Sequence, residues 1–230
     1  MSLFWLFLLC PLSYLLGSVS FSFIITKLLF RKDLAKQGSG NLGATNVFRN
    51  YGFKVAFPVL ILDILKAAIP ATVGLLLYGP STHNWMHGFG TIDGQTALYS
   101  CGLAAFFGHC FPFWNKFKGG KGVATLVGVF LVANPLLTVP AFLLCLGVGH
   151  LLRCAALGSF FFITVAVLWQ GFYVGGVVGI GMTTSIFLTF AYFAILFTHR
   201  ANIGRLLRGT ENKVSLFKEK KHIIEHEQRK

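Results

Sequence analysis

Long apolar runs constrain the fold of this chain more than any other feature of its sequence. Crossing the hydrocarbon core of a bilayer takes about 20 helical residues. Four runs come near or exceed that length: Leu3 to Leu29, Phe53 to Tyr78, Thr96 to Phe113 and Phe172 to Phe197. Hydrophobic residues make up 55% of the chain and charged residues only 12%, a composition that a soluble domain could not cover with polar surface. The sequence therefore predicts an all-α, polytopic integral membrane protein.

The stretch from Val123 to Trp169 decides how many spans are predicted, because Asn134-Pro135, Pro140 and Arg153 interrupt it. The stretch could form either one span, with a leftover apolar piece that does not cross the membrane, or three short helices. The three helices would run roughly from Val123 to Ala133, from Leu136 to Leu152 and from Leu157 to Trp169. The first of them is too short to cross a full bilayer alone.

The distribution of Lys and Arg favours the three short helices, since these residues mark cytoplasmic loops. They cluster at residues 27–54, at residues 116–121, at Arg153 and from Arg200 onward, whereas the connection over residues 79–95 has none. Three short helices put every cluster on one side. The prediction is seven transmembrane helices, with the N-terminus outside and the C-terminus cytoplasmic. No repeat or linker divides the chain, so we expect one membrane domain over residues 1–213 and a basic cytoplasmic tail over residues 214–230.

The net charge of +13 follows from the same asymmetry. The basic tail would face anionic lipid head groups. Nucleic-acid binding is not expected, because no stacking aromatic residues alternate with the basic residues of the tail.

Three polar segments interrupt the apolar pattern, each at the end of a hydrophobic run. They are Gly38 to Arg49, Phe117 to Thr125, and His199 to Arg205. All three fall on the side predicted to be cytoplasmic, so they can meet at one membrane face. Backbone donors and cations gathered there suit a substrate that carries phosphate.

In the first segment, glycines allow tight turns that expose backbone N–H groups. Arg49 supplies the planar fork that matches a phosphate or carboxylate. Side-chain donors come from Ser39, Asn41 and Thr45. The alternative is a glycine-rich turn with an arginine that reaches the membrane surface.

The second segment places Gly119, Gly120 and Gly122 around Lys121, at the entrance to a helix predicted to begin near Val123. This pattern is typical of an anion nest with a point charge. The alternative is a basic cytoplasmic turn.

In the third segment, His199, Asn202 and Arg205 follow at helical spacing and share a face. His199 is either an interfacial residue or a functional one, and in the second case either a base or a positioning residue. No metal site is predicted, because His83 and His87 are spaced four apart without a third ligand.

The three segments, in this order along the hydrophobic runs, resemble the bacterial acyl-phosphate:glycerol-3-phosphate acyltransferases of the PlsY type. The resemblance extends to about Lys213. Its smaller pieces are Asp63-Ile64-Leu65-Lys66, Gly108-His109-Cys110-Phe111-Pro112 and Leu157-Gly158-Ser159.

The resemblance implies a seven-helix enzyme of the bacterial cytoplasmic (inner) membrane, with its active site on the cytoplasmic face and no cofactor or metal. It would acylate the sn-1 hydroxyl of glycerol 3-phosphate from a long-chain acyl phosphate, giving lysophosphatidic acid and phosphate, the first step of phospholipid synthesis. The implied partners are these two substrates and membrane lipid, with the enzyme that makes acyl phosphate as a further candidate.

By motif position, the resemblance assigns catalytic roles to Ser39, Arg49, His199 and Asn202. It assigns substrate or phosphate binding to Gly40, Asn41, Thr45, Asn46, Gly119, Gly120, Lys121, Gly122 and Ser159. One departure is Cys154-Ala155-Ala156, where the family often has an aromatic residue and a Ser. The role of that Ser is either missing here or taken by Ser159.

A transporter of phosphate or small organic anions is the alternative function. Its carrier features would be the break at Asn134-Pro135 and an internal ion pair between Asp63 and Lys66, which are one helical turn apart. The alternative is a purely structural pair. Against a transporter, the cations collect at one face, whereas a carrier would place its site near the midplane.

Overall fold

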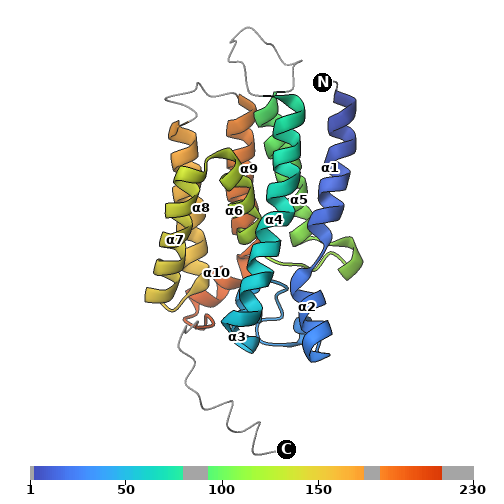
Figure 1. Cartoon of the computed structure of the whole chain (residues 1–230). Helices are drawn as coiled ribbons and strands as arrows, with labels where there is room; N and C mark the ends of the chain where they lie inside the picture. The colour runs from blue at the N-terminus through green and yellow to red at the C-terminus, as the bar shows by residue number, and fades with distance from the viewer. Residues whose placement is uncertain (1–2, 80–92, 174–181, 214–230) are drawn as a thin grey trace, which may run out of the picture.

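The computed structural model describes residues 3–79, 93–173 and 182–213, and over these ranges it is helical, without any strand. The longer helices lie side by side along the long axis of the molecule (Figure 1). They are α1 (Leu3–Ser18), α4 (Phe53–Tyr78), α5 (Gly94–Cys110), α7 (Pro135–Leu151), α8 (Ala155–Tyr173) and α9 (Met182–Thr198). The shorter α6 (Val123–Ala133) packs against α4 and α5. The prediction of an all-α fold is confirmed.

Three short helices gather at the end of the molecule opposite the start of α1 (Figure 1). They are α2 (Phe21–Phe30), α3 (Ala44–Tyr51) and α10 (Arg200–Leu207). The 3-10 turn Leu34–Lys36 lies between α2 and α3, and a second one, Phe113–Asn115, lies between α5 and α6. Only Gly52 separates α3 from α4, and its φ of 81° lies in the region that favours glycine. This sharp turn sets α3 across the end of α4, and Val47 of α3 is buried together with Val59 of α4.

The composition of the first apolar run predicts one continuous helix. The structure instead has two helices, α1 and α2, separated by Val19 and Ser20. Ser20 caps α2, because its hydroxyl accepts from the Phe23 N–H at 3.4 Å. The carbonyl of Val19, which the break releases, accepts from Lys66 Nζ at 2.8 Å. A side chain 47 residues away therefore satisfies the backbone at this break.

The stretch from Val123 to Trp169 forms three separate helices, so this part of the prediction is confirmed. Asn134 is extended between α6 and α7, and Pro135 opens α7. Arg153, with a φ of 51°, follows the end of α7 and turns the chain into α8.

Two of the described helical stretches are long and apolar enough to cross a membrane, Phe4–Phe30 and Phe53–Tyr78. A third candidate is Ser185–Thr198 with Arg200–Leu207, which are bent by 57° relative to each other. The other apolar helices are shorter: Val123–Ala133, Pro135–Leu151 and Ala155–Gln170. The count of seven spans remains a prediction.

The packing is apolar on the outside as well as inside. Phe106, Phe162 and Ile195 are fully buried in the main cluster between the helices. Leu76 and Leu136 face outward with 73% and 84% of their surface exposed. An exterior of this kind suits lipid, since soluble proteins rarely expose such extended apolar surface.

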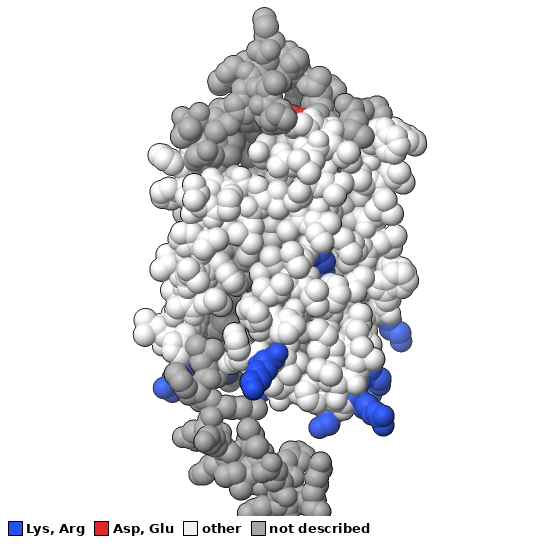
Figure 2. Space-filling model, viewed as in Figure 1, with Lys and Arg blue, Asp and Glu red and all other residues white. Residues whose placement is uncertain are grey.

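Lys and Arg side chains gather at the end of the molecule that carries α2, α3 and α10 (Figure 2). This one-sided distribution fits the sequence prediction that the basic clusters share a membrane face. Which face is cytoplasmic stays a prediction, as does the tail over residues 214–230, which lies outside the described ranges along with His83 and His87.

Candidate active site

The three polar segments meet at one cavity of about 410 Å³ near the basic end of the molecule. Its wall includes ten residues that the sequence assigned to the site: Ser39, Asn41, Thr45, Asn46, Arg49, Lys121, Gly122, Ser159, His199 and Asn202. Three assigned glycines, Gly40, Gly119 and Gly120, are not part of the wall. Gly40 has a φ of 69° and serves the turn before α3.

Asn46 folds the first segment onto α3. Its Oδ1 accepts from the Ser39 N–H at 3.1 Å, and its Nδ2 donates to the Gln37 carbonyl at 3.0 Å. Asn50 Nδ2 donates to the same Oδ1 at 3.2 Å. A Cβ on Gly38 would lie 2.4 Å from Asn46 Oδ1, which explains a glycine there. The amide of Asn46 is therefore engaged in shaping the loop that presents Ser39.

Arg49, in the last turn of α3, is part of the cavity wall and also contacts the chain beyond α10. Its Nη2 donates to the Asn212 carbonyl at 3.0 Å. Its Nε is buried and has no hydrogen-bond partner among the described residues. Burial lowers the pKa of Arg49, yet a guanidinium stays charged in proteins. A buried cation with a free donor suits an anionic substrate group.

Lys121 and Gly122 bring the second segment to the wall at the start of α6. Gly122 has a φ of 88°, and a Cβ there would lie 1.9 Å from the Phe106 ring, so only glycine fits. The Lys121 carbonyl accepts from Thr198 Oγ1 at 2.9 Å, which fixes this segment against the end of α9, directly before the third segment. Burial lowers the pKa of the Lys121 ammonium to about 8.

His199 occupies the bend between α9 and α10, where it is 2% exposed. Its Nδ1 lies 3.0 Å from the Ile195 carbonyl, an arrangement that places the proton on Nδ1 and leaves Nε2 as the acceptor of a neutral ring. Burial, together with the nearby Lys121 charge, lowers the pKa of His199 to about 4. The imidazole is therefore neutral near pH 7.

Asn202 of α10 is part of the cavity wall. Its Nδ2 donates to Glu211 Oε1 at 2.9 Å, which fixes the orientation of the amide. Its Oδ1 is buried and has no partner among the described residues. Two residues of the wall thus have a buried, unpaired polar atom, an acceptor on Asn202 and a donor on Arg49.

Sequence reasoning missed Glu211, which organises the third segment from the far side. Glu211 Oε2 accepts from Arg205 Nε at 3.0 Å, while its other oxygen holds Asn202. The available signal was charge: Glu211 is the sole acidic residue between His199 and Lys213.

Ser159 lines the cavity, but its hydroxyl donates to the Ala155 carbonyl at 2.8 Å. With its one proton engaged, Ser159 can only accept a hydrogen bond from a ligand. Ala156 lies in the same part of the wall and brings no polar atom. Asp63, His109 and His150 also contribute to the wall, although sequence reasoning placed none of them in the site.

The other part of the wall is apolar and reaches the exterior. It comprises Phe53, Phe57, Leu60, Phe142 and Leu146, and of these Phe53, Phe57 and Leu146 are exposed. The cavity therefore joins a cationic, donor-rich region to a lipid-facing one. Within the described ranges no group of three His, Cys, Asp or Glu side chains could hold a metal ion.

Comparisons with known proteins point to one family. The sequence matches the family described as glycerol-3-phosphate acyltransferase over residues 7–209. It is 41% identical over 215 residues to the glycerol-3-phosphate acyltransferase of Halalkalibacterium halodurans, covering 90% of this chain and 94% of the relative. It is 40% identical over 211 residues to that of Sinorhizobium fredii, covering 90% and 92%.

The fold is similar to the crystal structure of PlsY (YgiH), an integral membrane glycerol 3-phosphate acyltransferase, in its glycerol 3-phosphate form. The TM-score is 0.77 at 34% identity, covering 95% of this chain and 98% of the other. The lysophosphatidic acid form gives a TM-score of 0.75, with 92% and 96% covered. Fold and site thus define a membrane acyltransferase. The chain belongs to the glycerol-3-phosphate acyltransferase family, as its three polar segments predict.

Proposed function

We propose that this protein transfers a fatty acyl group from a long-chain acyl phosphate to the sn-1 hydroxyl of glycerol 3-phosphate. The products would be lysophosphatidic acid and inorganic phosphate, in the first acylation of phospholipid synthesis. The observation that carries the proposal is a cavity whose wall is cationic in one part and apolar in the other. An acyl chain can stay in lipid beside Phe53 and Leu146 while its phosphate reaches Arg49 and Lys121.

Both proposed substrates carry a phosphate, and we assign each phosphate to one cationic region of the wall. Arg49, with Ser39 and Thr45 of the first segment, forms one cationic region. Lys121 with the adjoining backbone at the start of α6 forms the other. Cations and backbone donors held in place before substrate arrives stabilise charge that develops during the reaction.

The proposed step is a direct acyl transfer. The sn-1 hydroxyl oxygen attacks the acyl carbonyl carbon, a new ester bond forms, and the bond from that carbon to the phosphate oxygen breaks. The departing phosphate retains the electron pair, and the hydroxyl proton passes to a phosphate oxygen. Because the leaving group is a stable anion, alignment of the hydroxyl and neutralisation of phosphate charge can supply most of the acceleration.

His199 and Asn202 act in this scheme as orienting groups. Asn202 Oδ1 is a buried free acceptor, so it can hold a substrate hydroxyl. The neutral imidazole of His199 offers an acceptor at Nε2 beside it, because Nδ1 faces the Ile195 carbonyl. Ser159 is left with an accepting role, which suits a hydroxyl better than a phosphate.

We further propose that the site opens on the cytoplasmic face of the bacterial inner membrane, in a seven-span protein with its N-terminus outside. The gathering of Lys and Arg around the cavity end supports this orientation (Figure 2). The enzyme that makes acyl phosphate would deliver the donor at that face.

The test is incubation of the purified protein with glycerol 3-phosphate and a long-chain acyl phosphate, with release of phosphate and formation of lysophosphatidic acid as readouts. We expect both products in equal amounts, and little turnover when acyl-CoA replaces acyl phosphate at the same concentration. Equal turnover with acyl-CoA would contradict the proposed donor. Uptake of labelled glycerol 3-phosphate into liposomes without conversion would instead favour a carrier.

A further inference from the structure

Three polar side chains lie in the helical interior and take no part in the acyl transfer proposed above. Asp63 and Lys66 of α4 are 1% and 2% exposed, and His109 of α5 is 6% exposed. Groups of this kind are costly away from water unless each one has partners. The internal ion pair predicted from the spacing of Asp63 and Lys66 is confirmed, with Lys66 Nζ 2.8 Å from Asp63 Oδ1.

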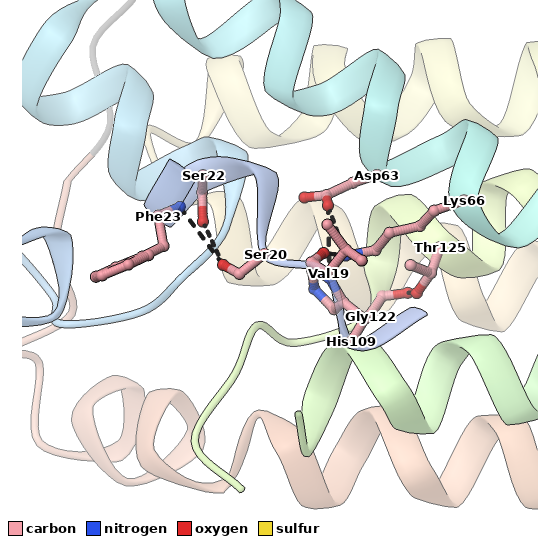
Figure 3. A network of polar contacts seen from close by, with 9 residues as sticks. All are labelled: Val19, Ser20, Ser22, Phe23, Asp63, Lys66, His109, Gly122 and Thr125. Carbon is pink, nitrogen blue, oxygen red and sulfur yellow. Dashed lines mark hydrogen bonds and ion pairs between the residues drawn. The ribbon is translucent and has the colours of Figure 1, made fainter. Parts of the chain in front are cut away.

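The pair also faces His109, as Figure 3 shows. His109 Nδ1 lies 3.7 Å from the same Asp63 Oδ1 that Lys66 contacts. Lys66 in turn donates to the Val19 carbonyl at 2.8 Å, so its own position is fixed by the break between α1 and α2. Nδ1 is therefore the ring nitrogen that faces Asp63, at a distance longer than a hydrogen bond.

The opposite edge of the His109 ring lies against the loop that precedes Lys121. A Cβ on Gly120 would be 1.9 Å from His109 Nε2, and its three nearest atoms all belong to this ring. The backbone follows the same path, because the Gly120 N–H donates to the His109 carbonyl at 3.0 Å and the Gly119 N–H to the Cys110 carbonyl at 3.1 Å. Gly119 and Gly120 are thus glycines because His109 and its neighbour come so close.

We propose that His109 is a positioning residue that sets the place of the loop over residues 118–122, with Asp63 and Lys66 fixing the direction of its ring. The inference rests on the proposed role of Lys121 in binding a substrate phosphate. Lys121 directly follows the two glycines that His109 contacts, so a shift of the ring displaces the phosphate-binding donors. Displacement of about 1 Å at such a site costs on the order of 100-fold in rate.

The first test compares KM values, which do not depend on how much of a variant folds. Lys121→Ala identifies the substrate whose phosphate the loop binds, as the one whose KM rises. His109→Ala should raise the KM of that same substrate by about tenfold, while the KM of the other substrate stays within about twofold. A disturbance of the whole fold would instead lower the amount of active protein without this selectivity.

The second test is a double-mutant cycle between the ring and the glycine. Gly120→Ala should lower kcat/KM by about 100-fold, and the double variant Gly120→Ala with His109→Ala should recover at least about tenfold, because the added methyl then has room. Gly147→Ala is the matched control, since a methyl added at Gly147 would meet no atom within 4 Å and the variant should behave like the parent. Asp63→Asn should add nothing to the KM effect in the His109→Ala background.

The outcomes separate the two proposals. If Lys121→Ala raises neither KM, the proposed phosphate role of the loop fails, and the positioning role falls with it. If Lys121→Ala raises one KM but His109→Ala leaves it unchanged, only the positioning role is refuted. It is also refuted if the double variant is no more active than Gly120→Ala alone.

Discussion

Substitution of Arg49 tests whether its guanidinium contacts the substrate or only adds a charge at the membrane surface. Its Nη2 donates to the Asn212 carbonyl, and its buried Nε has no partner among the described residues. We expect the Nε to donate to a substrate phosphate. We expect Arg49→Lys to lose about 100-fold in kcat/KM, nearly as much as Arg49→Ala, because an ammonium cannot make both contacts in one plane. Steady-state kinetics with both substrates measure this. Arg208→Lys, an exposed exchange at the end of α10, should stay at parent activity. Parent-like activity of Arg49→Lys would reduce Arg49 to a surface charge.

The lowered pKa of Lys121 should make stability and substrate binding change with pH in opposite directions. Its pKa is lowered from 10.5 to about 8, so the folded protein holds fewer protons than the unfolded chain between these values. Stability contributed by this group therefore rises with pH across that window, while the loop loses charge. The KM of the substrate bound there should rise above pH 8, by up to about tenfold per pH unit.

Lys121→Arg serves as the comparison for that profile, because an arginine keeps its charge throughout the range. Kinetics between pH 6.5 and 9.5 should show a flat KM in this variant, at a higher starting value if the longer side chain fits less well. An identical rise in both proteins would mean that another group, or the substrate itself, titrates.

Substitution of His199 tests whether the acyl transfer requires a base supplied by the protein. His199→Gln should retain measurable turnover, because an amide can still orient the Asn202 region by hydrogen bonding and the substrate phosphate takes the proton. Addition of EDTA should leave the activity of the parent protein intact. Phosphate release and substrate binding are measured together. Loss of all turnover with unchanged binding would make His199 the general base.

Among the helices, the break between α1 and α2 depends on α4. Lys66→Met leaves the Asp63 carboxylate buried without its cation and the Val19 carbonyl without a donor. Removing one partner of such a buried pair costs about 3 kcal/mol or more. Thermal unfolding in detergent should therefore occur at a clearly lower temperature. Asp63→Asn with Lys66→Met should recover part of the loss, and Lys54→Met, an exposed exchange on the same helix, should be neutral.

The same break shows what the sequence could not predict about the helices. Apolar runs and Pro135 were enough to place α4, α6, α7 and α8, since hydropathy and helix-start signals are local. The sequence has no proline at positions 19 and 20, so its first apolar run predicts one continuous helix. The break is stabilised by a lysine far along the chain, so only the packed structure reveals it.

Across the whole molecule, sequence reasoning was most successful where chemistry is concentrated. Glycine, cation and amide patterns identified segments that do line one cavity, including Arg49, Lys121 and Asn202. They could not separate groups facing the cavity from groups that hold its wall, such as Asn46 or Gly120. That distinction depends on contacts between segments, because a side chain's free hydrogen-bonding atoms are decided by its neighbours.

The orientation of the molecule in the membrane gives the last prediction. Single cysteines at positions 39, 49, 121, 153 and 200, in a background without the five native cysteines, should all react with a membrane-impermeant reagent only after the cytoplasmic side is opened. The physical reason is that the Lys and Arg side chains gather at one end, around the cavity, and positive loops stay inside (Figure 2). A cysteine in the connection over residues 79–95, which lacks Lys and Arg, should react from outside in intact cells and serves as the control.

Labelling of position 153 from outside would overturn the seven-span arrangement. Labelling of position 49 from outside would also move the acyl-transfer site to the other face, where the proposed donor is not made.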